Sequence, residues 1–285
     1  MPSQRLLVIN ADDFGFAPGV NRGIVEAHGA GTLPSASMMV NTPAFADAAA
    51  LARERMPRLG IGLHLNLLAG RPLSVVPTRT NPHDGSFHSL GTLARRALSG
   101  QLSPSDVRRE CDAQLGALVA QGIRPTHLDS HRHTHALPGV LPAVLASARA
   151  AGVHIVRRPL DRPVVRDAVA SARMLALHGA WRWALRGIAP EDRTVLARSP
   201  NFRGIAMQGA ADVERRLLEL LDHLPAGSTE IMMHPGYDDA VLAALDPYRS
   251  EREREVAALC SAAVRGRLAQ GDIRLVRFDE LATSN

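Results

Sequence analysis

The run Leu6-Leu7-Val8-Ile9-Asn10-Ala11-Asp12-Asp13-Phe14-Gly15 is the most informative stretch of this chain, because a short apolar segment ends there in two adjacent carboxylates. A continuous apolar run of this length is typical of a strand buried on both faces of a parallel sheet. Similar runs recur along the chain and are separated by helix-like stretches. The candidate strands are residues 5–10, 36–41, 59–65, 125–129, 153–156, 230–233 and 273–276, with a weaker one near Val195 or Ile205.

Helix signals fill the intervals between these runs. Pro18 lies just inside one helix start, residues 103–106 form a capping-box pattern, and Gly122, Gly152 and Gly271 mark helix ends. Seven or eight such strand and helix units predict an α/β fold, a TIM-like (β/α) barrel that is either complete or an incomplete, distorted form. An open doubly wound sheet is the alternative, although no GxGxxG motif follows the first strand.

Length and composition favour one domain, residues 1–285, because 285 residues with 46% hydrophobic content suffice for one large core. No apolar stretch reaches the ~18 residues that a membrane span requires, and the chain enters a strand-like run at once. We therefore expect a soluble cytoplasmic protein. A homodimer is the default assembly, since small dimers are the commonest among soluble enzymes.

The chain contains no lysine, so all 33 of its positive side chains are arginines. Schiff-base, pyridoxal-phosphate and P-loop chemistry each need a lysine amine and are excluded. The net charge of +5 is spread over many helix-like segments, and only 4% of residues are aromatic. We expect no nucleic-acid partner, because such proteins concentrate basic residues and use aromatic side chains to stack on bases.

Two stretches interrupt the alternation of strands and helices. Residues 70–102 are rich in Pro, Gly, Ser and His, which predicts a long loop over the active face. Residues 161–198 combine arginines with both tryptophans, Trp181 and Trp183. This segment would suit a partner-facing helix or a peripheral membrane contact. Such a stripe is more often the core face of an outer helix, and we favour that interpretation.

Chemically active side chains gather just after the candidate strands. In parallel α/β proteins these carboxyl ends of strands meet at one face, where the loops after the strands form the site. Two imidazoles and a carboxylate suit Zn²⁺ or a similar divalent ion, which lowers the pKa of bound water from about 15.7 to as low as about 7. The candidate residues are Asp12, Asp13, His64, residues 127–135, Arg157 and His234.

These motifs also resemble a known family. The motifs Ala11-Asp12-Asp13-Phe14-Gly15, Gly62-Leu63-His64-Leu65-Asn66, His127-Leu128-Asp129-Ser130-His131-Arg132-His133-Thr134-His135 and His234-Pro235-Gly236 are similar to those of the YdjC/ChbG-type carbohydrate deacetylases, which include a hopanoid-associated branch. The resemblance implies a (β/α) barrel related to polysaccharide deacetylases. It also implies one divalent metal ion and hydrolysis of the N-acetyl group of an amino sugar.

The resemblance assigns roles position by position. Asp13, His64 and His131 match the metal ligands, Asp12 the general base and His234 the general acid. Arg157 is similar to an arginine that orients the base, while Asp129, His133 and His135 match positions that support the ligands or contact substrate. The metal stays open between Zn²⁺ and Mg²⁺, and Mn²⁺, Co²⁺ and Ni²⁺ suit the same ligands.

The acceptor has two candidates. The family's best-understood substrates are chito-oligosaccharides such as diacetylchitobiose, whereas the hopanoid branch implies an N-acetylglucosaminyl glycolipid. Two other classes use similar residues. A metal-dependent phosphoesterase shares the ligand types but needs more phosphate-binding cations, and a non-catalytic sugar-binding protein needs no general base.

Overall fold

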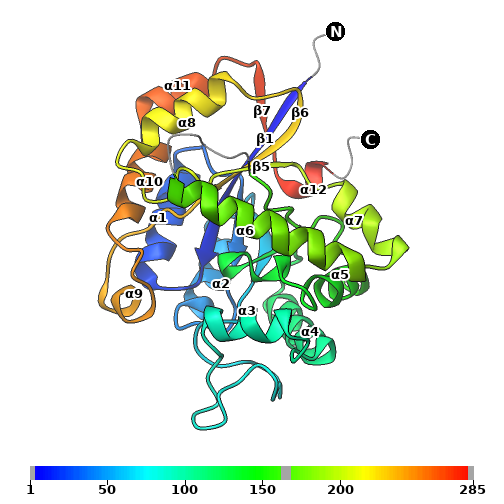
Figure 1. Cartoon of the computed structure of the whole chain (residues 1–285). Helices are drawn as coiled ribbons and strands as arrows, with labels where there is room; N and C mark the ends of the chain where they lie inside the picture. Colours follow the sequence, from blue (N-terminus) through cyan, green and yellow to red (C-terminus); the bar gives the residue numbers. More distant parts are fainter. Residues whose placement is uncertain (1–3, 162–167, 282–285) are drawn as a thin grey trace.

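A seven-stranded, all-parallel sheet forms the centre of the protein (Figure 1). The computed structural model describes residues 4–161 and 168–281. Hydrogen-bonded neighbours follow the order β4-β3-β2-β1-β6-β5, and β7 pairs with β1 beside this path. The strands are β1 (Arg5–Phe14), β2 (Ser35–Met38), β3 (Gly60–Leu65), β4 (Leu128–Ser130), β5 (Asn201–Arg203), β6 (Gly227–Met233) and β7 (Ile273–Leu275).

Strand β1 is the longest and organises the sheet. On one side it pairs with β6 from Arg5 to Ala11. On the other side it pairs first with β7 and then, from Asn10 onward, with β2. Residues 7–14 of this strand are all buried, as the continuous apolar run predicts for a strand covered on both faces.

The sheet is an incomplete barrel, since no ladder joins β4 to β5 within the described residues. The strand predicted at residues 153–156 is wrong: this segment makes one isolated bridge, Leu128 to Val156. The chain just before β5 contacts residues 153–156 through a side chain: the Ser199 hydroxyl donates a hydrogen bond to the Val156 carbonyl. The weaker candidate strand is β5, which lies between the two positions suggested for it.

Helices surround the sheet, and Figure 1 shows α6 crossing in front of it. The predicted helix signals are present. Pro18 opens its helix, Ser103 Oγ accepts from the Asp106 N–H, and Gly122, Gly152 and Gly271 have positive φ just after helix ends. The helices are α1 (Pro18–Gly29), α2 (Phe45–Glu54), α3 (Leu90–Leu98), α4 (Pro104–Ala120), α5 (Leu141–Ala150), α6 (Ala168–Ala184), α7 (Arg193–Ala197), α8 (Val213–Asp222), α9 (Ala240–Leu245), α10 (Glu251–Cys260), α11 (Ala262–Leu268) and α12 (Phe278–Leu281), with short 3-10 turns η1 (His131–Ala136), η2 (Leu185–Gly187) and η3 (Pro190–Asp192).

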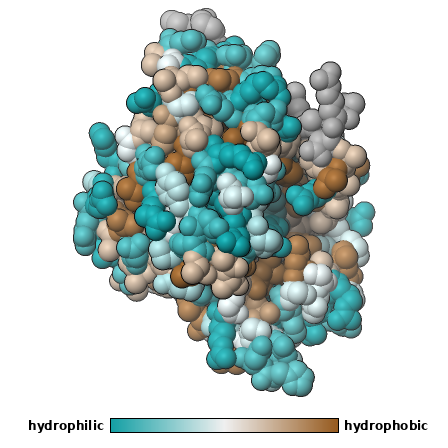
Figure 2. Space-filling view, turned by 90° about the vertical axis from the view of Figure 1, so that its left-hand side faces the viewer, coloured by the Kyte–Doolittle hydropathy of each residue, from teal (hydrophilic) through white to brown (hydrophobic). Residues whose placement is uncertain are grey.

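The stretch 70–102 is only partly the loop that its composition predicts. Helix α3 occupies its end, and Thr80 and Phe87 form an antiparallel bridge. Leu93 and Ala97 bury the inner side of this helix, so its apolar spacing outweighs the surrounding glycines and serines. Part of the stretch projects at the bottom of Figure 1, and the corresponding end in Figure 2 is hydrophilic.

Helix α6 accounts for most of the described part of the Trp- and Arg-rich segment. Met174 and Trp181 are buried in it, which confirms that one side is the core face of an outer helix. Residues 162–167 of the same segment, including Arg166, lie outside the described residues. No described helix is long and apolar enough to cross a membrane.

Candidate active site

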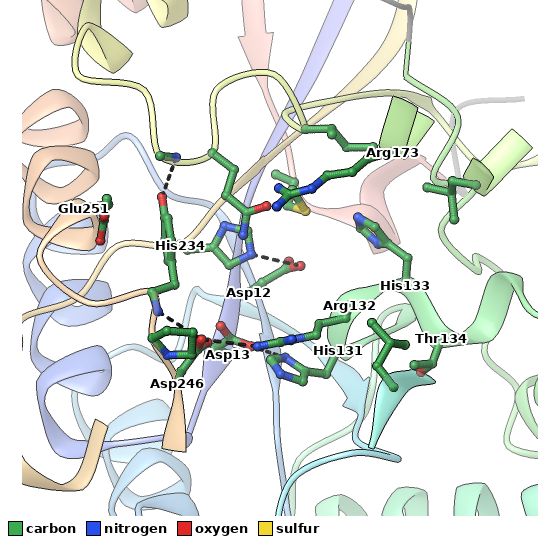
Figure 3. Close-up of a pocket in the computed structure, with 18 of the residues that line it drawn as sticks. Asp12, Asp13, His131, Arg132, His133, Thr134, Arg173, His234, Asp246 and Glu251 are labelled. Atoms are coloured by element: carbon green, nitrogen blue, oxygen red, sulfur yellow. Dashed lines mark hydrogen bonds and ion pairs between the residues drawn. The ribbon is translucent and has the colours of Figure 1, made fainter. Parts of the chain in front are cut away.

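A cavity of about 740 Å³ opens at the carboxyl ends of the strands. Residues from three distant regions of the chain line it: Asp12 and Asp13 at the end of β1, His131 in η1 after β4, and His234 after β6 (Figure 3). The parallel topology therefore brings together side chains that are more than two hundred residues apart in sequence.

A backbone irregularity lets both adjacent aspartates face this cavity. Successive strand residues normally point to opposite faces of a sheet. The register between β1 and β2 shifts between Ala11 and Phe14, and Asp13 has a φ of 69°. Aspartate tolerates this left-handed conformation better than most residues, so the pair Asp12-Asp13 permits a bulge that redirects its second side chain.

Asp13, His64 and His131 form a compact group of candidate metal ligands. Their ligand atoms lie within 4.8 Å of one another, and all three side chains are buried. The Asp13 Oδ1 atom is 3.2 Å from His64 Nε2 and 3.0 Å from His131 Nδ1. A second group, Asp12, His64 and Asp129, meets the same distance condition and shares His64.

The surroundings of His64 favour positive charge. Burial by itself would lower the pKa of His64, but the charges of Asp129 and Asp12 outweigh it and raise that pKa to about 10. Asp129 Oδ1 accepts from His64 Nδ1 at 2.7 Å, which leaves Nε2 directed at Asp13. A divalent cation fits this arrangement, since carboxylate and imidazole donors meet where the protein's own charges attract a cation.

Asp12 is held by a buried arginine. Arg157 donates from Nη1 and Nη2 to the two oxygens of Asp12, each at 2.7 Å. The same guanidinium lies 2.7 Å from Asp129 Oδ2 and 2.6 Å from Glu230 Oε1. Although its burial acts in the opposite direction, these three carboxylates keep the pKa of Arg157 well above its usual value. Asp12 is thereby fixed in orientation and kept beside a permanent positive charge.

Glu230 is the least satisfied of the three carboxylates. Burial raises its pKa to about 7, with Asp129 and Asp12 adding to the effect and Arg157 opposing it. Its Oε2 atom is buried and has no hydrogen-bond partner among the described residues. A protonated Glu230 reduces the negative charge that surrounds one arginine.

His234 lies beside Asp12, because β6 and β1 are paired neighbours in the sheet. Its Nε2 atom is 4.0 Å from Asp12 Oδ2. The imidazole packs edge-on against Tyr248 at a centroid distance of 5.7 Å, and its backbone N–H donates to Glu255. Tyr248 also donates its hydroxyl hydrogen to Glu255, so the loop that carries His234 is tied to α10.

The remaining histidines of the long motif have different environments. His135 is enclosed between Ser130 Oγ, at 2.6 Å, and the Arg157 carbonyl, at 3.0 Å. Burial lowers its pKa to about 4, which suits a neutral structural ring. His133 lines the cavity, and its Nδ1 atom has no partner among the described residues. Arg132 and His133 both have positive φ, a strained turn of the kind found at functional sites.

Sequence motifs missed a second arginine in this site. Arg252 of α10 donates to Asp13 Oδ2 at 2.7 Å and to Asp246 Oδ2 at 3.2 Å. It is fully buried and fixes the second oxygen of Asp13. No local pattern distinguishes it, because Ser250-Glu251-Arg252-Glu253-Arg254 reads as an ordinary charged helix start. Glu230 carried a usable signal, since it is a charged residue within an apolar run.

Comparison with known proteins finds relatives that match nearly the whole chain. A family model described as "YdjC-like protein" matches residues 6–270. A carbohydrate deacetylase of Geobacillus stearothermophilus is 35% identical, covering 97% of this chain and 98% of its own length. A chitooligosaccharide deacetylase of Serratia marcescens is 34% identical, covering 98% of this chain and all of its own length, 100%.

A solved structure extends the likeness to three dimensions. It is described as a putative cellobiose-phosphate cleavage protein from Enterococcus faecalis and superposes with a TM-score of 0.77 at 27% identity, covering 98% of this chain and 99% of its own. Both the sequence matches and this superposition extend over nearly the whole chain. The chain therefore belongs to the YdjC-like protein family, as its motifs predict.

Proposed function

We propose that this protein is a metal-dependent carbohydrate deacetylase, which hydrolyses the N-acetyl group of an amino sugar and releases acetate. One observation carries the proposal: the candidate ligands Asp13, His64 and His131 lie beside an arginine-bound Asp12 that His234 faces at 4.0 Å. Family membership supports it, since the two relatives described above are named as deacetylases of carbohydrate and of chitooligosaccharide.

Asp13, His64 and His131 would hold the divalent ion, which is Zn²⁺ or Mg²⁺ in this proposal. When bound there, such an ion supplies Lewis acidity toward the acetamide oxygen and toward water. Arg252 holds the far oxygen of Asp13, and Asp129 holds His64 Nδ1, so two ligand orientations are already fixed.

The proton transfers fall to Asp12 and His234. Asp12 takes a proton from the attacking water, and Arg157 holds this carboxylate in orientation through both of its oxygens. Asp12 Oδ1 also accepts from Asn10, so Oδ2, the oxygen nearer His234, has fewer donors and is freer to act. His234 gives a proton to the departing amine. The reaction consumes one water, cleaves the amide C–N bond, and yields acetate and the free amino sugar.

Acetate release from diacetylchitobiose tests the proposal. The wild-type protein should release acetate, a chelator should stop it, and Asp12→Asn should lower the turnover by about 10²–10⁴-fold, the usual contribution of a general base. Arg22→Gln, on the outer helix α1, is the matched surface control. Full turnover by Asp12→Asn would refute the assigned base. Hydrolysis of p-nitrophenyl phosphate without acetate release would show instead that the protein is a phosphoesterase.

A glycolipid acceptor is the second candidate, because one wall of the cavity is apolar. Ala176, Leu177 and Ala180 of α6 line it together with Leu137 and Ile205. An apolar aglycone would bury this wall, whereas a soluble oligosaccharide would leave it in water. Comparing octyl and methyl N-acetylglucosaminides separates the two acceptors. A higher kcat/KM for the octyl glycoside favours the glycolipid, and equal values favour the soluble sugar.

A further inference from the structure

The outward side of α6 is an apolar surface that the proposed chemistry does not use. Its residues recur at spacings of three and four, so they lie along one side of the helix, away from the buried Met174 and Trp181. An outer helix normally turns polar residues to solvent. Here the solvent-facing stripe is Val169, Ala172, Ala176, Gly179 and Trp183, with Leu175 at its edge.

The large members of this stripe are well exposed. Val169 is 65% exposed, Leu175 64% and Trp183 47%. Large apolar side chains on one exposed helix face mark an interaction site more often than isolated ones do. We call this stripe, without Ala176, which also lines the cavity, and with the neighbouring Arg182, the α6 face.

Charge identifies the kind of partner. From Ala168 to Pro190 the chain has no Asp or Glu, whereas Arg173, Arg182 and Arg186 are all present. A second copy of this chain is a poor partner, because a symmetric contact between two such stretches would place arginines near arginines, and the stretch itself offers no acid to pair them. An anionic lipid surface complements both properties: arginine heads reach phosphates, and Trp and Leu enter the boundary between headgroups and acyl chains.

The α6 face adjoins the active-site cavity. Arg173, Leu177 and Ala180, one step around the same helix, line that cavity, and Figure 3 shows Arg173 reaching into it. Leu90, at the start of α3, lines the cavity from another element and is also partly exposed. A lipid surface in contact with the α6 face would therefore lie beside the active-site cavity.

We propose that the α6 face docks this protein onto an anionic lipid bilayer as a peripheral contact. The helix lies in the plane of the interface, with Leu175 and Trp183 among the acyl chains and Arg182 and Arg186 at the phosphates. Docking is independent of the proposed deacetylase function, since no residue of the α6 face belongs to the proposed proton-transfer or ligand set.

Vesicle flotation tests the proposal. The full chain should float with phosphatidylcholine vesicles that contain phosphatidylglycerol, but not with phosphatidylcholine alone, and salt should weaken binding. Leu175→Ser with Trp183→Ser should abolish flotation. Arg182→Gln with Arg186→Gln should lower the partition coefficient roughly thirtyfold. Val119→Ser, which removes a similarly exposed apolar side chain from α4, should bind like the wild type.

Tryptophan emission gives an independent readout. Trp181 is buried and Trp183 is exposed. Anionic vesicles should therefore shift the emission maximum of the wild type to the blue, and the emission maximum of a Trp183→Phe variant should not change. Acetate release from soluble diacetylchitobiose should be the same in every α6-face variant, which separates docking from catalysis. Absence of flotation with anionic vesicles overturns the proposal. The proposal is also overturned if the wild type is a dimer and the Leu175 and Trp183 substitutions make it monomeric, because the α6 face would then be a subunit interface.

Discussion

At the residue scale, Arg157 is the group on which the proposed base depends. It is a positioning residue, since it acts through Asp12 and holds both oxygens of that carboxylate. Lysine would keep the positive charge among Asp12, Asp129 and Glu230 but cannot make the bidentate contact. Removing the charge altogether would leave three carboxylates buried together and endanger folding.

We predict that Arg157→Lys lowers kcat about 10²-fold with little change in KM, because it misorients a base without removing substrate contacts. Steady-state kinetics of acetate release measure both constants. The melting temperature and bound metal should stay close to wild type. An equal fall in metal content would show instead that Arg157 supports the ligands, and unchanged kcat would remove it from the mechanism.

The buried carboxyl group of Glu230 leads to a prediction about how stability depends on pH. Its folded-state pKa of about 7 lies above its ordinary value of 4.5, so the folded protein binds this proton more tightly than the unfolded chain does. Glu230 therefore contributes most to stability below about pH 4.5, and this contribution is lost as the pH rises toward 7. Glu230→Gln has no such proton to lose.

The melting temperature of Glu230→Gln relative to the wild type should therefore increase between about pH 5 and about pH 8, whatever the constant cost of the lost contact with Arg157. Differential scanning calorimetry across this range measures the difference. A flat difference for Glu230→Gln would mean that the carboxyl is ionised in the folded protein at neutral pH.

At the element scale, the strands that carry ligands were predictable and their exact shapes were not. The apolar runs identify β1, β3 and β6 because strands buried on both faces are continuous in hydrophobicity. Residues 153–156 have a similar composition but meet β4 through one bridge only, and no described strand pairs with their other side. The helix within 70–102 was missed because loop-forming residues surround a short amphipathic segment.

The bend after β1 provides a test of local geometry. Gly15 has a φ of 91°, and a Cβ there would lie 2.6 Å from the Met39 carbonyl oxygen. Gly31 has a similar φ of 81° but no atom within 4 Å of a built Cβ. We predict that Gly15→Ala lowers the free energy of unfolding by about 2 kcal/mol or more, whereas Gly31→Ala costs only about 1 kcal/mol of backbone strain. Urea unfolding of both variants separates the clash from the strain, and equal losses would contradict the close approach.

At the scale of the whole molecule, the barrel topology explains why motifs far apart in sequence could be joined into one predicted site. Asp13 and His64 lie at the carboxyl ends of their strands, and His131 and His234 directly follow theirs, so the shared carboxyl edge of one parallel sheet brings them together. Arg252 could not be predicted in this way because it approaches from a helix. The sequence places side chains at strand ends, but contacts between outer helices and the site depend on packing that no local pattern encodes.

The same arrangement predicts that the proposed metal ion stabilises the entire fold. Asp13 comes from β1, His64 from β3 and His131 from η1, so an ion bound by them would link segments that unfolding separates. Saturation at about a thousandfold over Kd adds about 4 kcal/mol, which for a chain of this size raises the melting temperature by roughly 5–10 °C. Chelator should lower the wild-type melting temperature by that amount, and adding back Zn²⁺ or Mg²⁺ should restore it. His131→Ala, which lacks one ligand, should melt at one temperature with or without chelator. An equal chelator effect in this variant would place the stabilising ion elsewhere, and no effect in metal-loaded wild type would exclude a structural contribution from this site.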